Sequence, residues 1–282
     1  GLQSGNHTAT VTYYGDDKYE AVNTTVTLKV GDFFEVFAPN VEKYYHGPER
    51  FNVYVLLNGE GVADKTVKIT LNGVTYERTT DENGTASIGL NLNSGQTYNV
   101  TVKVVDIELN STVTIKPTVI GTDVTKIYKN GTQYYATFYD REGNLLANTA
   151  VAFNINGVFY NRTTDAHGVA KLNINLLPGE YIITAINPDS GEMKSNTITV
   201  LSQFVEHGDL VKVYGTSDPY VVQIRTKDGN IAGAGATVTF NINGVIYNKQ
   251  TNATGHVSLN INLQPGEYII TGYYNDERVS DK

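Results

Sequence analysis

The chain has 282 residues and a formal net charge of −8, with 29 Asp and Glu against 21 Lys and Arg. It contains no Cys, which excludes disulfide scaffolds, thiolate metal sites and thiol nucleophiles. The acidic balance is the wrong sign for a protein that binds a phosphate backbone, so no nucleic-acid partner is expected. No stretch approaches about 18 consecutive apolar residues, so we expect no membrane span in this segment.

The first 30 residues resemble the end of a unit that occurs again further along the chain. The opening contains SGNHTATVTYY followed by NTTVTLKV, and residues 178–201 contain PGEYIITAIN followed by NTITVL. Residues 1–30 are therefore predicted to be the last strands of a preceding repeat. On this interpretation the chain is part of a longer array.

Three further units follow, at residues 31–116, 117–201 and 202–282. Each contains one version of the same core sequence: TVKITLNGVTY at Thr66–Tyr76, TAVAFNINGVFY at Thr149–Tyr160 and ATVTFNINGVIY at Ala236–Tyr247. The last unit ends at TGYYNDERVSDK and has no equivalent of NTITVL, so we expect it to lack its last strand.

A tyrosine recurs after a Gly-containing turn in every unit. Tyr98 and Tyr181 are 83 residues apart, and Tyr181 and Tyr268 are 87 apart. This period is too long for a solenoid unit and fits one small sandwich domain. The three tyrosines are expected to bond back to the backbone through their hydroxyl groups, as tyrosine corners do.

Apolar and polar residues alternate within each unit. Val151, Phe153 and Ile155 alternate with Ala152 and Asn154, the period-two pattern of an antiparallel strand with one buried face. Turn sequences such as NG, DENG and DAHG separate these segments, and no stretch shows a helical period. The predicted fold class is all-β, with tandem Ig-like antiparallel β-sandwich domains of about seven strands each.

These units resemble the Ig-like repeats of adhesin-like proteins on the surface of methanogenic archaea. The resemblance rests on KIYKNGTQY at Lys126–Tyr134, on VAFNINGVFYNRTTDAHGVAKLNINLLPGEYIIT at Val151–Thr184 and on VTYYGDDKYEAVNTTVTL at Val11–Leu28. The last of these is also similar to bacterial Ig-like repeats. The resemblance covers nearly the whole chain and implies an array of β-sandwich modules in a large surface protein. It implies no particular ligand.

Two lysine–asparagine pairs are candidates for intramolecular isopeptide bonds. Lys43 and Lys126 fall in the first strands of their units, and Asn110 and Asn196 fall in the last. Surface domains of the pilin type condense such residues when a buried acid moves the protons. No acid is evident, because Glu180 and Glu267 have no counterpart in the first unit. The alternative is that the lysines are exposed at strand edges and the asparagines belong to turns.

The sequon N-x-[ST] marks candidate glycosylation sites in an exported protein. It occurs eight times, at Asn6, Asn23, Asn83, Asn99, Asn110, Asn130, Asn161 and Asn252. The abundance of Asn and Thr raises this number by itself, so glycosylation and chance both remain open.

No catalytic motif or metal-binding motif is present. The histidines, none of which is at metal-ligand spacing from another, are His7, His46, His167, His207 and His256. Asp81 and Asp165 occupy the same turn in two units, but the third unit has Asn252 there, which argues against a required ligand. We expect no enzymatic activity, no catalytic residue and no cofactor.

The sequence therefore predicts a non-enzymatic stalk or adhesion module at the cell surface or outside the cell, supporting attachment to another cell or surface. The alternatives are a module that binds carbohydrate or cell-wall polymer, and an accessory segment of a surface enzyme. The partner would be a surface protein or a glycan. Exchange of a strand with another copy of the chain is a further alternative.

Overall fold

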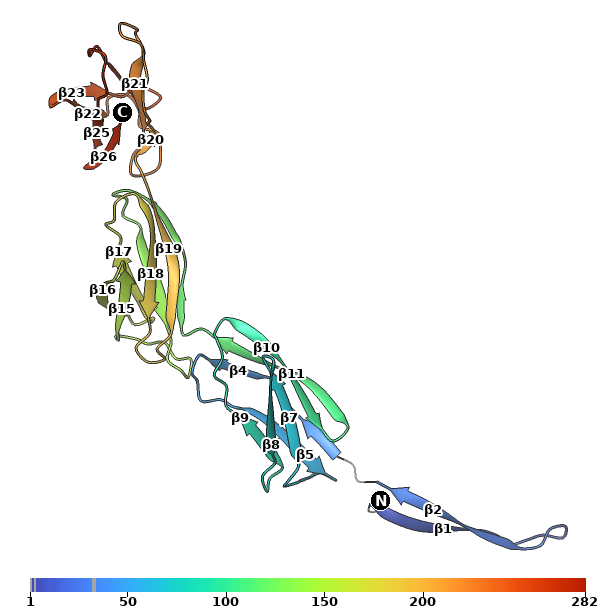
Figure 1. Ribbon diagram of the computed structural model, residues 1–282. Coiled ribbons are helices and arrows are strands. Elements are labelled where there is room, and N and C mark those ends of the chain that lie inside the picture. Colours follow the sequence, from blue (N-terminus) through green and yellow to red (C-terminus); the bar gives the residue numbers. More distant parts are fainter. Residues whose placement is uncertain (1, 3, 32–33) are drawn as a thin grey trace. The chain divides into compact units, whose positions relative to one another are not determined.

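The computed structural model describes residues 2, 4–31 and 34–282 (Figure 1). These residues form strands and no helix, so no described segment is a helix that could cross a membrane. The predicted fold class is confirmed: the protein is all-β, with tandem Ig-like sandwiches. Two compact units are present, Gly1–Pro117 and Thr118–Lys282.

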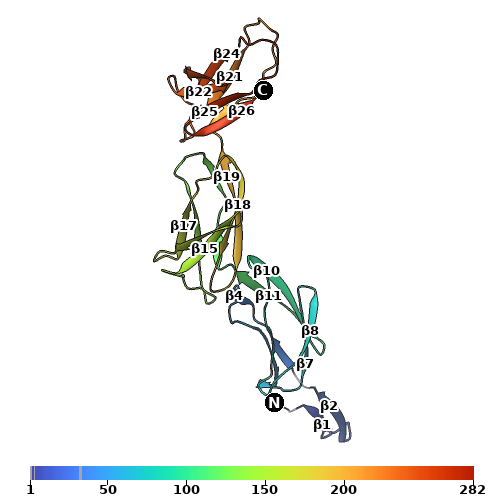
Figure 2. The same cartoon turned by 60° about the vertical axis from the view of Figure 1, so that its left-hand side comes forward.

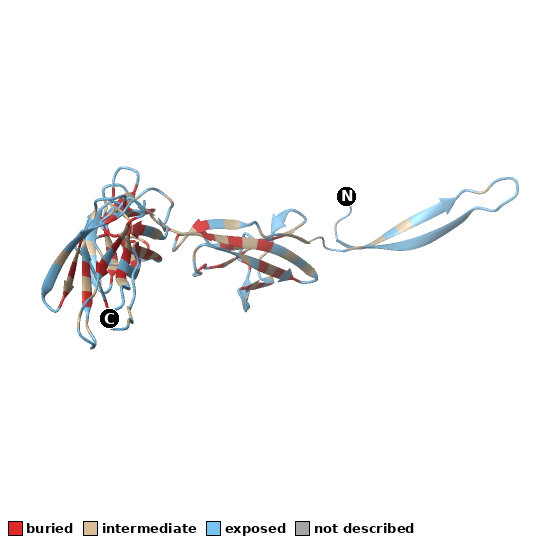
Figure 3. Ribbon diagram, turned by 90° about the horizontal axis from the view of Figure 1, so that it is seen from above, coloured by how far each residue is buried: buried red, intermediate tan, exposed pale blue. Residues whose placement is uncertain are grey.

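An isolated hairpin comes first in the chain. Strands β1 (Gly5–Tyr13) and β2 (Val22–Val30) pair with each other in an antiparallel two-stranded sheet. Their residues are mostly exposed on both faces (Figure 3). A two-stranded hairpin without a core is marginally stable by itself.

The first sandwich has one sheet in the order β4-β11-β10-β7-β8 and a second that contains β3, β5, β6 and β9. The strands of the first sheet are β4 (Val41–Tyr44), β11 (Ile107–Lys116), β10 (Gln96–Val104), β7 (Thr66–Leu71) and β8 (Val74–Thr79). Those of the second are β3 (Phe34–Phe37), β5 (Phe51–Leu57), β6 (Glu60–Gly61) and β9 (Thr85–Ile88).

The second sandwich repeats this plan, with sheets in the orders β13-β19-β18-β15-β16 and β12-β14-β17. The larger sheet consists of β13 (Val124–Ile127), β19 (Met193–Leu201), β18 (Gly179–Ile186), β15 (Ala150–Ile155) and β16 (Val158–Thr163). The smaller sheet consists of β12 (Val119–Gly121), β14 (Gln133–Phe138) and β17 (Val169–Asn173).

The third sandwich has sheets in the orders β23-β22-β25-β26 and β20-β21-β24. Figure 2 shows β22, β25 and β26 on one side of this sandwich and β21 and β24 on the other. The first sheet consists of β23 (Val245–Gln250), β22 (Thr237–Ile242), β25 (Ile270–Tyr274) and β26 (Glu277–Asp281). The second consists of β20 (Phe204–Glu206), β21 (Pro219–Ile224) and β24 (His256–Asn260).

Each sandwich has its own apolar core, built from the alternating residues that the sequence indicated. Val151, Phe153 and Ile155 are buried, and Phe153 lies edge-on to the Tyr134 ring. Phe240 and Tyr220 form the same edge-on pair in the third core. Separate clusters of buried residues lie within 51–115, 119–200 and 204–270. The repeat boundaries at 31, 117 and 202 stay a prediction.

The tyrosine-corner prediction is confirmed. The hydroxyl of Tyr98 donates to the carbonyl oxygen of Asn93 at 3.0 Å. The Tyr181 hydroxyl donates to the Leu177 carbonyl at 2.9 Å, and that of Tyr268 to the Gln264 carbonyl at 2.9 Å. Each ring therefore anchors the turn that precedes it in the chain.

One type of strand pairing, found in the first and second sandwiches, is parallel, whereas the other paired strands of these sandwiches are antiparallel. In the first sandwich β4 runs parallel to β11, with Val41 opposite Val113 and Tyr44 opposite Lys116. In the second, β13 runs parallel to β19, from Val124 opposite Ile198 to Ile127 opposite Leu201. In these two sandwiches a strand near the start thus lies beside the last strand.

Candidate functional site

A buried lysine lies at the same place in the first and second sandwiches. Lys126 of β13 has 5% of its surface exposed, and its Nζ donates to the carbonyl oxygens of Asn130, Thr132 and Ile174 at 2.5, 3.2 and 2.8 Å. An ammonium group has three donors, so this arrangement satisfies all of them. Burial lowers the pKa of Lys126 from its ordinary value.

Lys43 has the same surroundings in the first sandwich. Its Nζ donates to the carbonyl oxygens of Gly47, Glu49 and Leu90. Burial lowers its pKa, and the charge of Glu49 opposes this shift. The alternative that these lysines are exposed at strand edges is therefore wrong for Lys43 and Lys126.

The third sandwich contains the same group of bonds around Lys212. Its Nζ donates to the carbonyl oxygens of Thr216, Asp218 and Ile261 at 2.8, 3.0 and 2.9 Å. The three acceptors always lie four, six and 47–49 residues after the lysine. We call each of these groups a lysine cage. The cage ties the segment that follows the lysine to the residue just after, or two residues after, a strand of the opposite sheet.

The structure does not bring Lys126 and Asn196 together. Lys126 lies opposite Val200, four residues beyond Asn196. The Asn196 amide nitrogen donates to Gly121 O at 3.3 Å and to the Asp123 carboxylate at 3.1 Å, and its Oδ1 accepts from the Tyr134 hydroxyl at 2.8 Å. Both candidate partners thus have other hydrogen bonds.

Asn110 occupies a different position from Asn196. It is exposed on β11, and its Oδ1 accepts from the Thr101 hydroxyl. The inward-facing equivalent of Asn196 is Ser111, which donates to Ala38 O and Asn40 Oδ1. The sequence pairing was therefore one residue out of register. Lys43 lies opposite Ile115. The isopeptide bonds stay a prediction, for which an intact mass lower by one ammonia per bond is the test.

Two buried glutamates were missed by the sequence interpretation. Glu192 precedes β19, and its carboxylate accepts from the backbone N–H and the hydroxyl of Thr118 at 2.5 and 2.6 Å. Glu277 begins β26 and accepts from the Ser202 hydroxyl and from the Gln203 N–H. One feature of the sequence could have revealed these two glutamates. Glu192 lies 74 residues after Thr118, and Glu277 lies 74 residues after Gln203, so both occur at the same distance from the residue whose N–H they accept. Glu180 and Glu267, the repeated glutamates that the sequence analysis did not accept as the acid, are exposed.

The repeated acidic turn is a backbone cap. Asp165 Oδ1 accepts from the N–H groups of His167 and Val169, and Asp81 Oδ1 accepts from two N–H groups at the same offsets. Asn252 does the same in the third sandwich. An amide oxygen can replace a carboxylate in this turn, which explains the Asp-to-Asn difference between units. Among the described residues, no group of three or more His, Asp or Glu could hold a metal ion.

Seven of the eight predicted glycosylation sites are exposed. These are Asn6, Asn23, Asn83, Asn99, Asn110, Asn161 and Asn252. Asn130 is half-buried, and its Oδ1 accepts from the N–H and hydroxyl groups of Thr132. Exposure is what glycosylation requires, but the modification itself stays a prediction.

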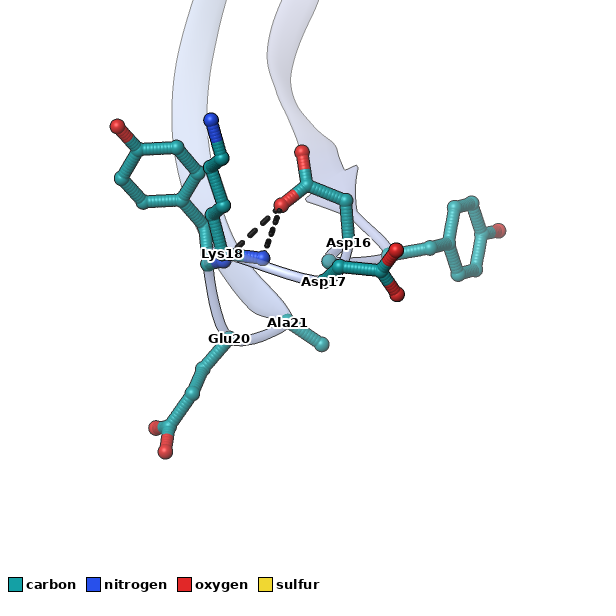
Figure 4. A pocket seen from close by; sticks show the side chains of 8 residues that line it. Asp16, Asp17, Lys18, Glu20 and Ala21 are labelled. Atoms are coloured by element: carbon teal, nitrogen blue, oxygen red, sulfur yellow. Dashed lines mark hydrogen bonds between the residues drawn. The ribbon is translucent and has the colours of Figure 1, made fainter.

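The tip of the β1–β2 hairpin carries exposed aromatic and charged side chains (Figure 4). Asp16 Oδ1 accepts from the backbone N–H groups of Lys18 and Tyr19 at 2.9 and 3.0 Å. The hydrogen bond from Tyr13 and then that from Lys18 lower the pKa of Asp16. Tyr14 is 87% exposed and Tyr19 67% exposed. The Asp16 turn thus presents two tyrosines to solvent.

No protein-family model matches the chain, and no curated protein does. Among solved structures, the I9–I11 tandem of titin is 13% identical, with 88% of this chain and 97% of that chain covered and a TM-score of 0.36. A 1.5-MDa bacterial ice-binding adhesin is 17% identical, with 88% and 95% covered and a TM-score of 0.26. Invasin, a bacterial integrin-binding protein, is 15% identical, with 88% and 59% covered and a TM-score of 0.27. At these scores the likenesses assign neither ligand nor activity, and an archaeal origin stays a prediction.

Proposed function

We propose that this chain is a non-enzymatic stalk segment of a cell-surface adhesin-like protein, and that its sandwiches carry tension between a surface and a binding tip. The observation that supports this most is the parallel pairing of the second strand with the last strand of a sandwich, β4 with β11 and β13 with β19. Three sandwiches, each with its own core, suit a chain that is pulled from its two ends.

The direction of force on these pairs follows from their orientation. Tension pulls β13 toward its N-terminal end and β19 toward its C-terminal end. Because the two strands are parallel, these pulls are opposed along the strand axes, so the bonds between them are loaded in shear. All the ladder bonds, together with that from Tyr128 N–H to Leu201 O at 2.9 Å, must then fail together.

Single-molecule pulling on the intact chain tests this proposal. We expect separate unfolding events, each releasing one sandwich and lengthening the chain by about 3.4 Å per residue released. Two of these events should occur at higher force, for the two sandwiches that have the parallel pair. Extension at low force without separate events would overturn the proposal.

A second candidate function is binding of carbohydrate or cell-wall polymer at the hairpin tip. Exposed tyrosines can stack on sugar rings, and Tyr14 and Tyr19 are among the most exposed aromatic side chains described. A glycan array probed with the chain and with a Tyr14→Ala, Tyr19→Ala variant checks this candidate. Binding that is lost in the variant supports it, and the absence of any bound glycan argues against it.

A further inference from the structure

Asn-Gly pairs occur six times in the chain, and four of them form the two residues of a tight hairpin turn. In these four turns φ lies between 50 and 53° at the asparagine and between 77 and 88° at the glycine. All eight residues are exposed, so the four turns are closely similar in shape and in access to water. They are Asn58 and Gly59 between β5 and β6, Asn72 and Gly73 between β7 and β8, Asn156 and Gly157 between β15 and β16, and Asn243 and Gly244 between β22 and β23.

An exposed asparagine that precedes a glycine can lose its side-chain nitrogen by deamidation. The main-chain nitrogen of the glycine gives up its proton and attacks Cγ of the asparagine, the bond from Cγ to Nδ2 breaks, and Nδ2 leaves as ammonia. Water then opens the five-membered imide and leaves aspartate or isoaspartate. The net reaction consumes one water and releases one ammonia. Glycine favours the attack because it has no Cβ near the reacting atoms.

In two of the four turns a side chain holds the attacking nitrogen. In the second sandwich the Gly157 N–H donates to Asn154 Oδ1 at 3.3 Å. In the third, the Gly244 N–H donates to Asn241 Oδ1 at 3.1 Å. We call this contact, from the glycine of the turn to the asparagine three residues before it, a guard bond. A guard bond stabilises the protonated nitrogen and must break before the nitrogen can attack, so it should slow deamidation.

The first sandwich has other residues at the position of the guard. Before Asn72 this residue is Thr70, whose hydroxyl bonds with the Thr75 hydroxyl at 2.9 Å. Before Asn58 it is Leu56, which has no polar atom in its side chain. Among the described residues, no side chain accepts a hydrogen bond from the glycine N–H of either turn. Both turns of the first sandwich are therefore open to the reaction.

The two remaining Asn-Gly pairs are restrained in other ways. Gly84, which follows Asn83, is buried, and its N–H donates to the Asp81 carbonyl at 2.9 Å. Asn130 Oδ1 accepts from the Thr132 N–H at 2.8 Å, which holds the carboxamide that would be attacked. Neither pair is expected to react as fast as the open turns of the first sandwich.

We propose that Asn58 and Asn72 are sites of spontaneous deamidation in the folded protein, and that guard bonds protect Asn156 and Asn243. Each event replaces a neutral side chain by a carboxylate and adds one negative charge to a chain whose net charge is already −8. The inference does not depend on the stalk function, because it rests on the chemistry of four turns.

The product at Asn72 should also change the sheet. This turn joins β7 to the edge strand β8, and Lys68 and Glu77 form an ion pair at 2.9 Å across the two strands. Isoaspartate routes the main chain through the side-chain carbon and so lengthens the turn by one carbon. The two-residue turn that sets the register of β7 and β8 then no longer fits.

Incubation of the intact chain in heavy-oxygen water at mildly alkaline pH, followed by peptide mapping with mass spectrometry, tests the proposal. The heavy oxygen marks conversion that took place during the incubation. We expect Asn58 and Asn72 to convert about threefold to tenfold faster than the two asparagines with a guard bond, since one neutral hydrogen bond must first be broken there. Equal rates at the four sites, or faster conversion at the guarded ones, would overturn the proposal.

The same incubation in urea separates the effect of the fold from that of local sequence. The four rates should converge in urea, because unfolding removes the guard bonds. A difference that persists in the unfolded chain would come from the neighbouring residues and would contradict the proposal.

Exchange of the residue at the guard position provides matched variants. Thr70→Asn supplies the missing carboxamide and should slow conversion of Asn72 about threefold or more, with Asn58 of the same sandwich as the internal standard. Asn154→Thr should accelerate conversion of Asn156 by a similar factor. An unchanged rate in either variant would show that the guard bond does not protect the turn.

Discussion

At the scale of single residues, the lysine cages link parts of each sandwich that are far apart in the sequence. Lys126 joins residues 130 and 132 to residue 174 through one ammonium group. Hydrogen bonds from a charged donor are among the stronger ones, and they are stronger still where water is excluded. The cages therefore replace part of the cohesion that a disulfide would give to a chain without Cys.

Lys126→Met should lower the free energy of unfolding of the second sandwich by about 2–4 kcal/mol, because three buried carbonyl groups lose their donor. Lys212→Met should cost less, since Lys212 is only half-buried and water can replace its bonds. Urea unfolding of both variants measures the two losses. Equal losses would contradict the importance of burial at Lys126.

The second residue-scale prediction concerns alkaline pH. Burial places the pKa of Lys126 below 10.5, its value in the unfolded chain, so the unfolded state binds more protons between the two values. The second sandwich should therefore become more stable as the pH rises through the folded-state pKa, and Lys126→Met should remove this rise. Denaturation of both proteins over that pH range checks the sign. A wild-type stability that falls more steeply than that of the variant would contradict it.

The third residue-scale prediction concerns the turn at Asp165. Asp165→Asn should leave stability close to that of the wild type, because Asn252 makes the same two bonds in the third sandwich. Asp165→Ala should be less stable, because the N–H groups of His167 and Val169 lose their acceptor. Thermal unfolding of the two variants measures the difference. Equal unfolding temperatures would show that the side-chain oxygen has no such role.

At the scale of strands, alternation and turn residues were sufficient to predict the fold. The segment Val151–Ile155 lies in β15 as its pattern indicated, and NG lies at residues 156–157 with positive φ at both. The register of the last strand could not be predicted, because Asn110 and Asn196 look alike in sequence while only Asn196 faces inward. The lysine cages could not be predicted from the sequence either. Their acceptors are backbone carbonyl groups, and because every residue has one, no residue type marks the acceptor positions.

The buried glutamates set the start of the last strand, and this gives a fourth prediction. Glu192→Ala should destabilise the second sandwich by about 1.5–3 kcal/mol, because the buried N–H of Thr118 loses its acceptor. The exposed Glu180→Ala in the same sandwich is the matched control, for which we expect a change within about 0.5 kcal/mol. Similar losses in the two variants by urea unfolding would contradict the structural role of Glu192.

At the scale of the whole molecule, the account depends on which strands bear the tension. The parallel pairs join the second strand and the last strand of the first and second sandwiches. Rupture force should therefore depend on β13 and β19 more than on strands in the middle of a sheet, even when the loss of thermodynamic stability is the same.

The most direct test is single-molecule pulling on the intact chain and on two variants, Ile198→Ala in β19 and Ile155→Ala in β15. Both side chains are buried, at 0% and 4% exposed, so each truncation should cost about 2–5 kcal/mol. We predict that Ile198→Ala removes one of the two high-force events and that Ile155→Ala retains both at nearly wild-type force. Equal weakening by the two variants, after their stabilities have been matched by urea unfolding, would contradict the stalk mechanism.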